Sequence, residues 1–202
     1  EREEVVVKFV GDSGDGMQLT GSMFSDVAAV VGNDLATFPD FPAEIRAPQN
    51  TVAGVSGFQV HMGSSKIFTT GDMVDVLVAM NPASLRANLK WARKGATILV
   101  DTDSFDEKAV EKAGYKVSPF ADNSLETYHV IKAPLTTLTR ESLKEKGVDN
   151  KTAERSKNMF ALGILYYIFN RDLKPSFRYF EEKFKKKPEL IDINKIVLQA
   201  GY

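Results

Sequence analysis

The amino-terminal residues contain a dense apolar run and then a periodic one, which predicts a buried strand followed by an amphipathic helix. Residues 5–10 include five apolar side chains, all β-branched or aromatic, as in a strand covered on both faces of a parallel sheet. Residues 17–31 repeat apolar side chains with the helical period. Between them, residues 11–16 read GDSGDG. In such a strand–loop–helix unit, backbone N–H groups and the positive end of the helix dipole can bind an anion, usually a phosphate.

Two further apolar runs, residues 75–80 and 96–100, predict core strands of the same type. Helical patterns follow them at residues 83–93 and 105–113, and residues 35–38 predict an additional strand. This repeated strand–helix order predicts an α/β fold with a Rossmann-like, doubly wound, mainly parallel sheet.

Polar segments follow three of these strands: the glycine loop, Asn81 and residues 101–103. Since ligands of doubly wound sheets bind beyond the carboxyl ends of the strands, we expect these segments to converge on one crevice. The glycine loop matches neither the dinucleotide-binding order G-x-G-x-x-G nor the P-loop, because Met17 and Gln18 replace the Lys and Ser/Thr of the latter. A tight turn without a ligand remains an open alternative.

The segment 39–49 carries three prolines, so it predicts neither a regular helix nor a central strand. It contains acidic residues and Arg46 among apolar neighbours, which fits a site loop or a plain connector equally well. Residues 51–62 predict a long strand. Its two internal glycines indicate either a close approach of another group or simply a bent strand.

From residue 134 the pattern becomes helical, with helices expected at 135–146 and 159–170 and two more to the end. We therefore expect one domain over residues 1–202, with an α/β core at about 4–133 and a helical part at about 134–202. The length of 202 residues and the 43% hydrophobic content suit a single globular domain. Both ends read as limits within a longer chain.

The composition excludes several classes of site. Lys and Arg number 26 against 27 Asp and Glu, so no global field favours nucleic acid or an anionic membrane. The chain has no cysteine and therefore cannot hold an iron–sulfur cluster or a cysteine-ligated zinc. Its two histidines lie far apart without metal-ligand spacing, and we expect no metal site and no catalytic residue. The longest apolar run is too short to span a membrane, and cytoplasm is the default location.

Four motifs in order resemble one family. They are VKFVGDSGDGMQ at 7–18, FPAEIRAPQNTVAGVS at 41–56, GD at 71–72 before DVLVAMN at 75–81, and KNMFALG at 157–163. Together they resemble the gamma domain of 2-oxoacid:ferredoxin oxidoreductases over roughly residues 4–200. The form of the motifs is most similar to the type fused to the amino terminus of the alpha subunit in 2-oxoglutarate:ferredoxin oxidoreductases. One departure is Arg46-Ala47-Pro48, where many gamma domains have Arg or Lys before Gly-Gly.

The resemblance implies an activity for the whole complex. Such enzymes convert a 2-oxoacid, coenzyme A and oxidised ferredoxin to an acyl-CoA, carbon dioxide and reduced ferredoxin. Thiamine diphosphate, magnesium and iron–sulfur clusters belong to other domains or subunits, so the partners implied are the alpha and beta subunits and ferredoxin. The gamma domain would cover the active site and contribute to coenzyme A binding. The Gly-Asp-Gly at 14–16 is similar to the start of a thiamine-diphosphate motif, but the paired asparagines that close that motif are missing, so we exclude thiamine binding here.

The resemblance also implies candidate contacts to coenzyme A. Backbone amides of the glycine loop would line the phosphate pocket, with the Ser13 hydroxyl as an additional donor. Arg46 would clamp a phosphate, because a guanidinium can bind two of its oxygens at once. The full set of candidates is Gly11, Ser13, Gly14, Asp15, Gly16, Gln18, Arg46, Thr51, Ser56 and Asn81. The carboxylates of Asp12 and Asp15 oppose a phosphate unless they point away or bind the ribose or adenine.

Two alternatives stay open beside this hypothesis. The domain could be a purely structural or assembly part of the same complex. It could also be a stand-alone nucleotide-binding α/β enzyme that uses Asp101 and Asp103 with a metal ion.

Overall fold

One sheet organises the residues that the computed structural model describes, 3–41 and 55–202. Its strands are β1 (Glu4–Asp12), β2 (Asp34–Asp40), β3 (Val55–Gly63), β4 (Val74–Ala79), β5 (Ala92–Asp101) and β6 (His129–Ala133). The α-helices are α1 (Met17–Val30), α2 (Pro82–Asn88), α3 (Glu107–Lys112), α4 (Leu135–Ser142), α5 (Asn150–Glu154), α6 (Lys157–Ile168), α7 (Lys174–Lys183) and α8 (Pro188–Gly201). Short 3-10 turns lie at Leu89–Trp91, Thr102–Ser104 and Lys144–Lys146.

The strands follow the order β2-β3-β1-β4-β5-β6. Neighbours from β1 through β4 and β5 to β6 pair in parallel, whereas β3 is antiparallel to both β1 and β2. The expected α/β fold with a mainly parallel sheet is therefore confirmed, with one reversed strand. Side chains alternate identically along a strand of either direction, so the pattern of residues 51–62 could not reveal the reversal.

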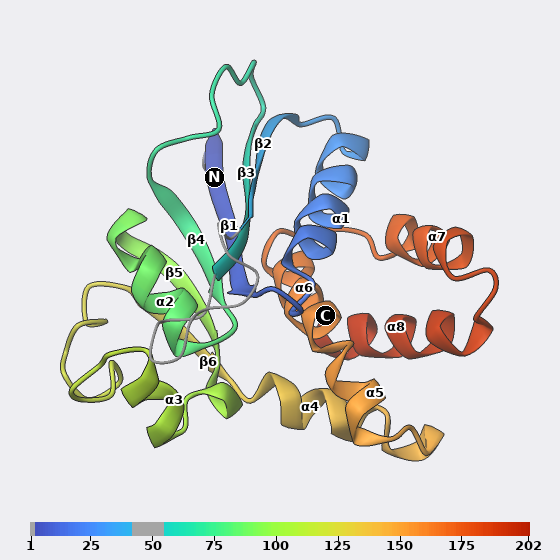
Figure 1. The fold of residues 1–202 in the computed structure, drawn as a ribbon. Helices are drawn as coiled ribbons and strands as arrows, with labels where there is room; N and C mark the ends of the chain where they lie inside the picture. Colours follow the sequence, from blue (N-terminus) through green and yellow to red (C-terminus); the bar gives the residue numbers. More distant parts are fainter. Residues whose placement is uncertain (1–2, 42–54) are drawn as a thin grey trace.

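Helices cover both faces of this sheet (Figure 1). α1 packs against β1, β2 and β3 together with α6, and α2 packs against β1 and β4. Val7 and Phe9 of β1 belong to the apolar cluster that includes α1, α6 and α8, whereas Val6 and Val10 join the second cluster with Leu85 of α2. β1 is thus buried on both faces, as its unbroken apolar run predicted.

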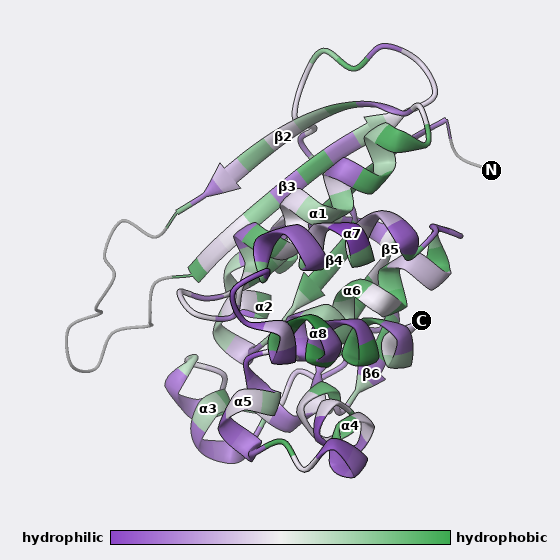
Figure 2. Ribbon diagram, turned by 90° about the vertical axis from the view of Figure 1, so that its right-hand side faces the viewer, coloured by the Kyte–Doolittle hydropathy of each residue, from purple (hydrophilic) through white to green (hydrophobic). Residues whose placement is uncertain are grey.

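The carboxyl-terminal helices form a tight group beside the sheet. A Cβ on Gly163 of α6 would meet a carbonyl oxygen of α8, and one on Gly201 of α8 would meet a carbonyl oxygen of α6. Glycine therefore allows these backbones to touch. The buried Tyr166 hydroxyl lies 3.2 Å from the carbonyl of Met23 in α1 and 2.8 Å from Ser176 Oγ in α7. Figure 2 shows mainly hydrophobic residues along β4 and mainly hydrophilic ones on α3 and α5 at the surface.

Residues 67–69 and 116–117 form no strands. In the first case the carbonyl groups of residues 69–71 accept hydrogen bonds from the side chains of Gln59 and His61 in β3. The loop is therefore held by side chains rather than by a backbone ladder. α5 was not expected, and its amino terminus is capped by the Asp149 side chain. Within the described ranges, none of the helices is long and apolar enough to cross a membrane.

Candidate functional site at the carboxyl edge of the sheet

The surroundings of the three glycines in residues 11–16, between β1 and α1, differ in whether they leave space for a side chain. A Cβ on Gly11 would lie 2.7 Å from Asp15 Oδ2. Gly16 has a φ of 73°, and a Cβ there would collide with the Asn158 side chain. A Cβ on Gly14 would have no atom of residues 3–41 or 55–202 within 4 Å. Internal packing thus accounts for glycine at two positions, while at Gly14 the described chain leaves open space.

Part of the loop's hydrogen-bonding capacity is used by its own turn. The amides of Gly14 and Asp15 donate to the carbonyl of Asp12 at 2.7 and 3.1 Å, and the Asp12 amide donates to Asp15 Oδ2 at 2.8 Å. Within the described chain, the amides of Ser13 and Gly16 meet no acceptor. Of the amides predicted to bind a phosphate, these two remain available, and Gly11 lies in the ladder opposite Ser56.

Asn81 links the carboxyl ends of β1 and β4. Its Nδ2 donates to Asp12 Oδ1 at 2.9 Å, while its Oδ1 accepts from the Ser84 amide at 2.8 Å and caps α2. Because α1 follows β1 on one face and α2 follows β4 on the other, this is the point where a doubly wound sheet opens a crevice. Burial, and then the Asp15 carboxylate, raise the pKa of Asp12 above its usual value.

Gln18, in the first turn of α1, bonds with the strands on the other side of β1. Its Nε2 donates to the carbonyl of Gly57 at 2.7 Å and lies 3.4 Å from Ser56 Oγ and from the carbonyl of Asp40. The sequence prediction that Gln18, Ser56 and Asn81 share one edge therefore agrees with their positions. Whether these residues contact a ligand stays a prediction.

The carboxyl-terminal helices supply two residues that the sequence prediction missed. Lys157 Nζ lies 3.5 Å from Asp15 Oδ1 and 3.6 Å from Asp101 Oδ2. The side-chain Nδ2 of Asn158 donates to Thr20 Oγ1 at 3.2 Å and to the carbonyl of Gly16 at 3.4 Å. Both residues begin the KNMFALG segment, so its place among the four motifs was the available signal.

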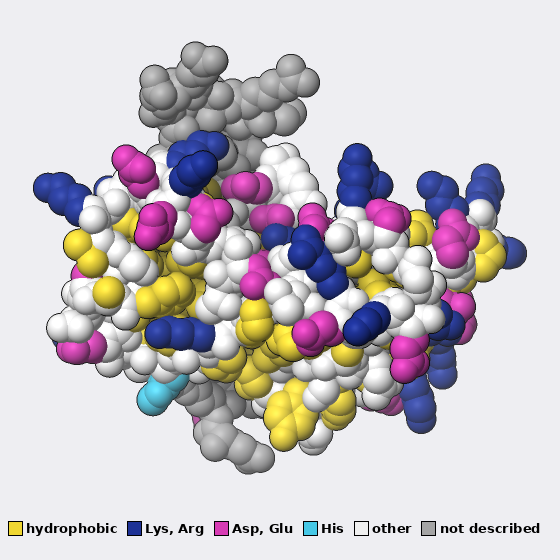
Figure 3. All heavy atoms as spheres, turned by 90° about the horizontal axis from the view of Figure 1, so that it is seen from below, with side chains coloured by type: hydrophobic (Ala, Val, Ile, Leu, Met, Phe, Trp, Pro, Cys, Tyr) yellow, Lys and Arg dark blue, Asp and Glu magenta, His cyan; other side chains and the backbone are white. Residues whose placement is uncertain are grey.

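Asp101 and Asp103 hold the backbone together at the end of β5. The fully buried Asp101 carboxylate accepts from the Leu135 amide at 3.0 Å, and Asp103 accepts from the Thr137 amide at 2.7 Å. Both therefore satisfy N–H groups at the start of α4. Among the described residues no group of three or more His, Cys, Asp or Glu could hold a metal ion. Figure 3, which views this end of the molecule, shows acidic and basic side chains interspersed rather than a continuous basic surface.

The sequence model of the pyruvate ferredoxin/flavodoxin oxidoreductase family matches residues 6–202. The chain belongs to this family. It is 46% identical over 200 residues to the 2-oxoglutarate oxidoreductase subunit KorA of Mycobacterium tuberculosis, and the match covers 99% of the chain but 31% of that subunit. The chain thus spans about a third of its curated relative's length.

Solved structures of the family have the same fold. A 2-oxoglutarate:ferredoxin oxidoreductase from Magnetococcus marinus, with 2-oxoglutarate, coenzyme A and succinyl-CoA bound, aligns over the whole chain and 31% of its own chain, with a TM-score of 0.75 and 26% identity. A keto/oxoacid ferredoxin oxidoreductase gamma subunit from Geobacter sulfurreducens aligns over 98% of the chain and 95% of its own, with a TM-score of 0.65 and 16% identity. The pyruvate oxidoreductase subunit PORC of Thermotoga maritima gives a TM-score of 0.62 at 19% identity, covering 100% and 96%.

Two predicted contacts of this family member, Arg46 and Thr51, lie outside the described residues. The preceding strand β2 ends, and the following strand β3 begins, at the same edge of the sheet as the carboxyl end of β1. Asp40, the last residue of β2, pairs with Gly57, and Val55, the first residue of β3, pairs with Asp12.

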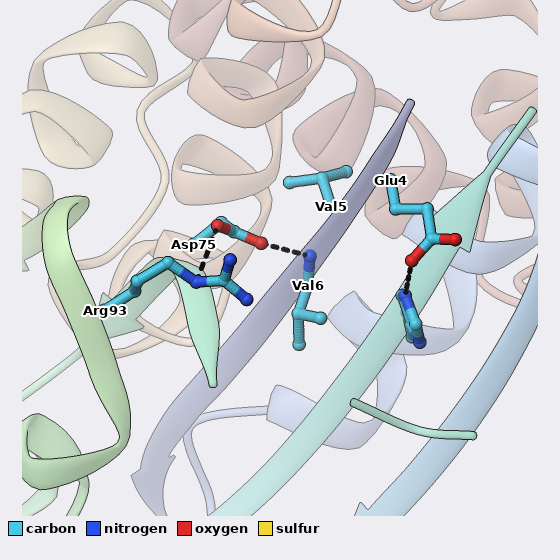
Figure 4. A pocket seen from close by; sticks show the side chains of 6 residues that line it. Glu4, Val5, Val6, Asp75 and Arg93 are labelled. Carbon is cyan, nitrogen blue, oxygen red and sulfur yellow. Dashed lines mark hydrogen bonds and ion pairs between the residues drawn. The ribbon is translucent and has the colours of Figure 1, made fainter. Parts of the chain in front are cut away.

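A pocket of about 200 Å³ lies at the opposite, amino-terminal end of β1 (Figure 4). Asp75 accepts from the Val6 amide at 3.0 Å and lies 3.5 Å from Arg93 Nε, and Glu4 Oε2 lies 3.1 Å from His61 Nε2. None of the predicted contacts that lie within the described ranges lines this pocket. We therefore place the candidate site of this family member at the carboxyl edge.

Proposed function

We propose that this chain is the gamma domain of a 2-oxoglutarate:ferredoxin oxidoreductase and that it contacts coenzyme A at the glycine loop. The sequence supports this, since the relative with 46% identity is a 2-oxoglutarate oxidoreductase subunit. A structural neighbour with 26% identity has coenzyme A bound. The domain spans residues 1–202 in this proposal, with the α/β core at about 4–133 and the helical part at about 134–202.

The proposed role is binding and orientation rather than chemistry. Coenzyme A brings the thiol that accepts the acyl group, while thiamine diphosphate, magnesium and iron–sulfur clusters come with other domains or subunits. This chain has no cysteine for a cluster. The amides of Ser13 and Gly16 and the amino terminus of α1 would meet the coenzyme, because they offer donors and a positive dipole end. The assembly would include alpha and beta subunits in the cytoplasm and pass electrons to ferredoxin.

The open space at Gly14 is the observation that carries the proposal. Glycine at this position is explained neither by a positive φ nor by a neighbouring atom of the residues that the structure describes. It lies at the crevice between β1 and β4, between the two amides that meet no acceptor in the described chain. A close approach of a ligand to the backbone accounts for the missing side chain.

Gly14→Val in the complete oxidoreductase tests the proposal. A Cβ at this position meets no atom of the described residues, so stability should change little, while the KM for coenzyme A should rise by about tenfold or more. Gly14→Ala should give a smaller rise. Arg46→Ala should also raise this KM, whereas Arg93→Ala, a matched loss of charge at the amino-terminal end of the sheet, should not.

An unchanged KM for coenzyme A in the folded, active Gly14→Val enzyme would contradict the proposed contact. It would favour the second candidate, a domain that covers the active site and holds subunits together. Exposed Tyr167 and Tyr202, whose rings meet edge to face 5.8 Å apart, are an available surface for such a role.

A further inference from the structure

We infer that Lys157 is a positioning residue for coenzyme binding, through which α6 holds the glycine loop in its binding position. This inference rests on the proposed function of that loop. It assigns a role to a residue that belongs to neither the loop nor the strands. The observations that carry it are one cation between two carboxylates and a second contact from the next residue.

The first carboxylate belongs to the loop itself. Asp15 Oδ2 accepts the Asp12 amide at 2.8 Å, so its side chain folds back over the turn, and Oδ1 lies 3.5 Å from Lys157 Nζ. The absence of a side chain at Gly11 leaves the space that this arrangement needs. The ammonium group therefore holds the Asp15 side chain in this folded-back position against the loop.

The second carboxylate fixes the position of Lys157. Asp101 is fully buried and accepts hydrogen bonds from Ser104, Leu135 and Thr136 at 3.0 to 3.2 Å. These bonds hold its Oδ2 atom, which lies 3.6 Å from Lys157 Nζ. Asp101 therefore fixes the position of the Lys157 ammonium group. Through the ion pair with Lys157, the position of the Asp15 side chain is fixed as well.

The neighbouring residue, Asn158, contacts the next residue of the loop. Asn158 donates to the carbonyl of Gly16 at 3.4 Å, and Gly16 carries the left-handed conformation from which α1 begins. Lys157 and Asn158 thus contact two consecutive residues of the loop, Asp15 through its side chain and Gly16 through its carbonyl. Since the side chains of Lys157 and Asp15 are only 17% and 16% exposed, solvent screens their pair less than a surface ion pair.

Lys157→Met in the complete oxidoreductase is the test. We expect the KM for coenzyme A to rise by about tenfold, with kcat and the KM for the 2-oxoacid changed less than about twofold. Lys157→Arg should restore most of the affinity, because it restores the charge. Lys195→Met is the matched control, since Lys195 forms an ion pair with Glu181 in the same helical part, away from the loop.

Asp15→Asn gives a second route if Lys157→Met fails to assemble. It keeps an oxygen that can accept the Asp12 amide but removes the ion pair, so the KM for coenzyme A should rise several-fold. In a double-mutant cycle the effects of Asp15→Asn and Lys157→Met should be less than additive. A lower or unchanged KM in Asp15→Asn would overturn the inference.

The outcomes separate this inference from the proposed function. If Gly14→Val raises the KM for coenzyme A and Lys157→Met leaves it unchanged, Lys157 has no positioning role although the loop binds the coenzyme. If Gly14→Val also leaves the KM unchanged, the proposed contact itself fails. If Lys157→Met lowers kcat/KM equally for coenzyme A and for the 2-oxoacid, and Lys157→Arg does not restore it, Lys157 supports only the fold.

Discussion

The two ends of β1 both gather carboxylates and basic side chains, but they connect different parts of the molecule. At the amino-terminal end, Asp75 and Arg93 join adjacent strands, and His61 lies beside Glu4 in the same half of the sheet. At the carboxyl end, Asp15 reaches Lys157 in α6.

This difference explains why a pocket alone does not identify the site. The amino-terminal pocket is lined by residues of neighbouring strands, and the contacts among these residues stabilise the edge of the sheet. The carboxyl edge has the amino terminus of α1, amides without acceptors in the described chain, and a glycine whose Cβ position is open space among the described residues. These features suit a ligand. Substitutions at the two ends should therefore separate stability from coenzyme binding.

Gly16→Val should have the largest effect on stability. It forces a β-branched residue into a left-handed conformation and against the Asn158 side chain, which should cost about 3 kcal/mol of unfolding free energy. Denaturant unfolding would measure it. Gly14→Val, two residues away, should cost less than about 0.5 kcal/mol. Equal losses in both variants would mean that the loop tolerates no side chain for reasons unrelated to a ligand.

Asp75→Ala should come next and should act on stability alone. It removes a buried acceptor of the Val6 amide and a partner of Arg93, at a cost of about 2 kcal/mol. The exposed Asp72→Ala is the nearby control, with an expected change within about 0.5 kcal/mol. A specific rise in the KM for coenzyme A in Asp75→Ala would break the proposed division between the two ends.

Asp12→Asn should have the smallest effect, and a pH-dependent one. Because burial and Asp15 raise the pKa of Asp12, the folded chain binds its proton more tightly than the unfolded chain does. Stability therefore falls as pH rises from the ordinary Asp value through the raised pKa. Asp12→Asn removes this loss and keeps an acceptor for Asn81, so its unfolding free energy relative to the parent should increase over that window.

Asp122→Asn supplies a control of opposite sign. Hydrogen bonds from Ser124 lower the pKa of Asp122, so the native carboxylate stabilises the fold above its ordinary pKa, and this contribution is lost as pH falls through the lowered value. Relative to the parent, Asp122→Asn should become less stable as pH rises. The same trend in Asp12→Asn would contradict the environment described for Asp12.

The sequence predicted the parts of the fold that depend on local pattern. The runs at 5–10, 75–80 and 96–100 form β1, β4 and β5, because strands buried on both faces need apolar side chains at every position. The direction of β3 was not predictable, since alternation is the same in either direction.

For the candidate site, the sequence could place residues that follow strands but not contacts between distant segments. Asn81 and the glycine loop share an edge because parallel strands end together. The pairing of Lys157 with Asp15 depends on how α6 packs, which no local pattern encodes. Asp101 follows a core strand, which is a position that suits a metal ligand. In the structure its carboxylate instead accepts hydrogen bonds from the first residues of α4.

Calorimetric titration of coenzyme A into the complete oxidoreductase tests the central claim most directly. We predict that Gly14→Val weakens binding by about tenfold or more while the melting temperature stays within a few degrees of the parent, and that Arg93→Ala binds as the parent does. Unchanged affinity in a folded Gly14→Val enzyme would contradict the account, because the open space at Gly14 would then have no ligand to explain it.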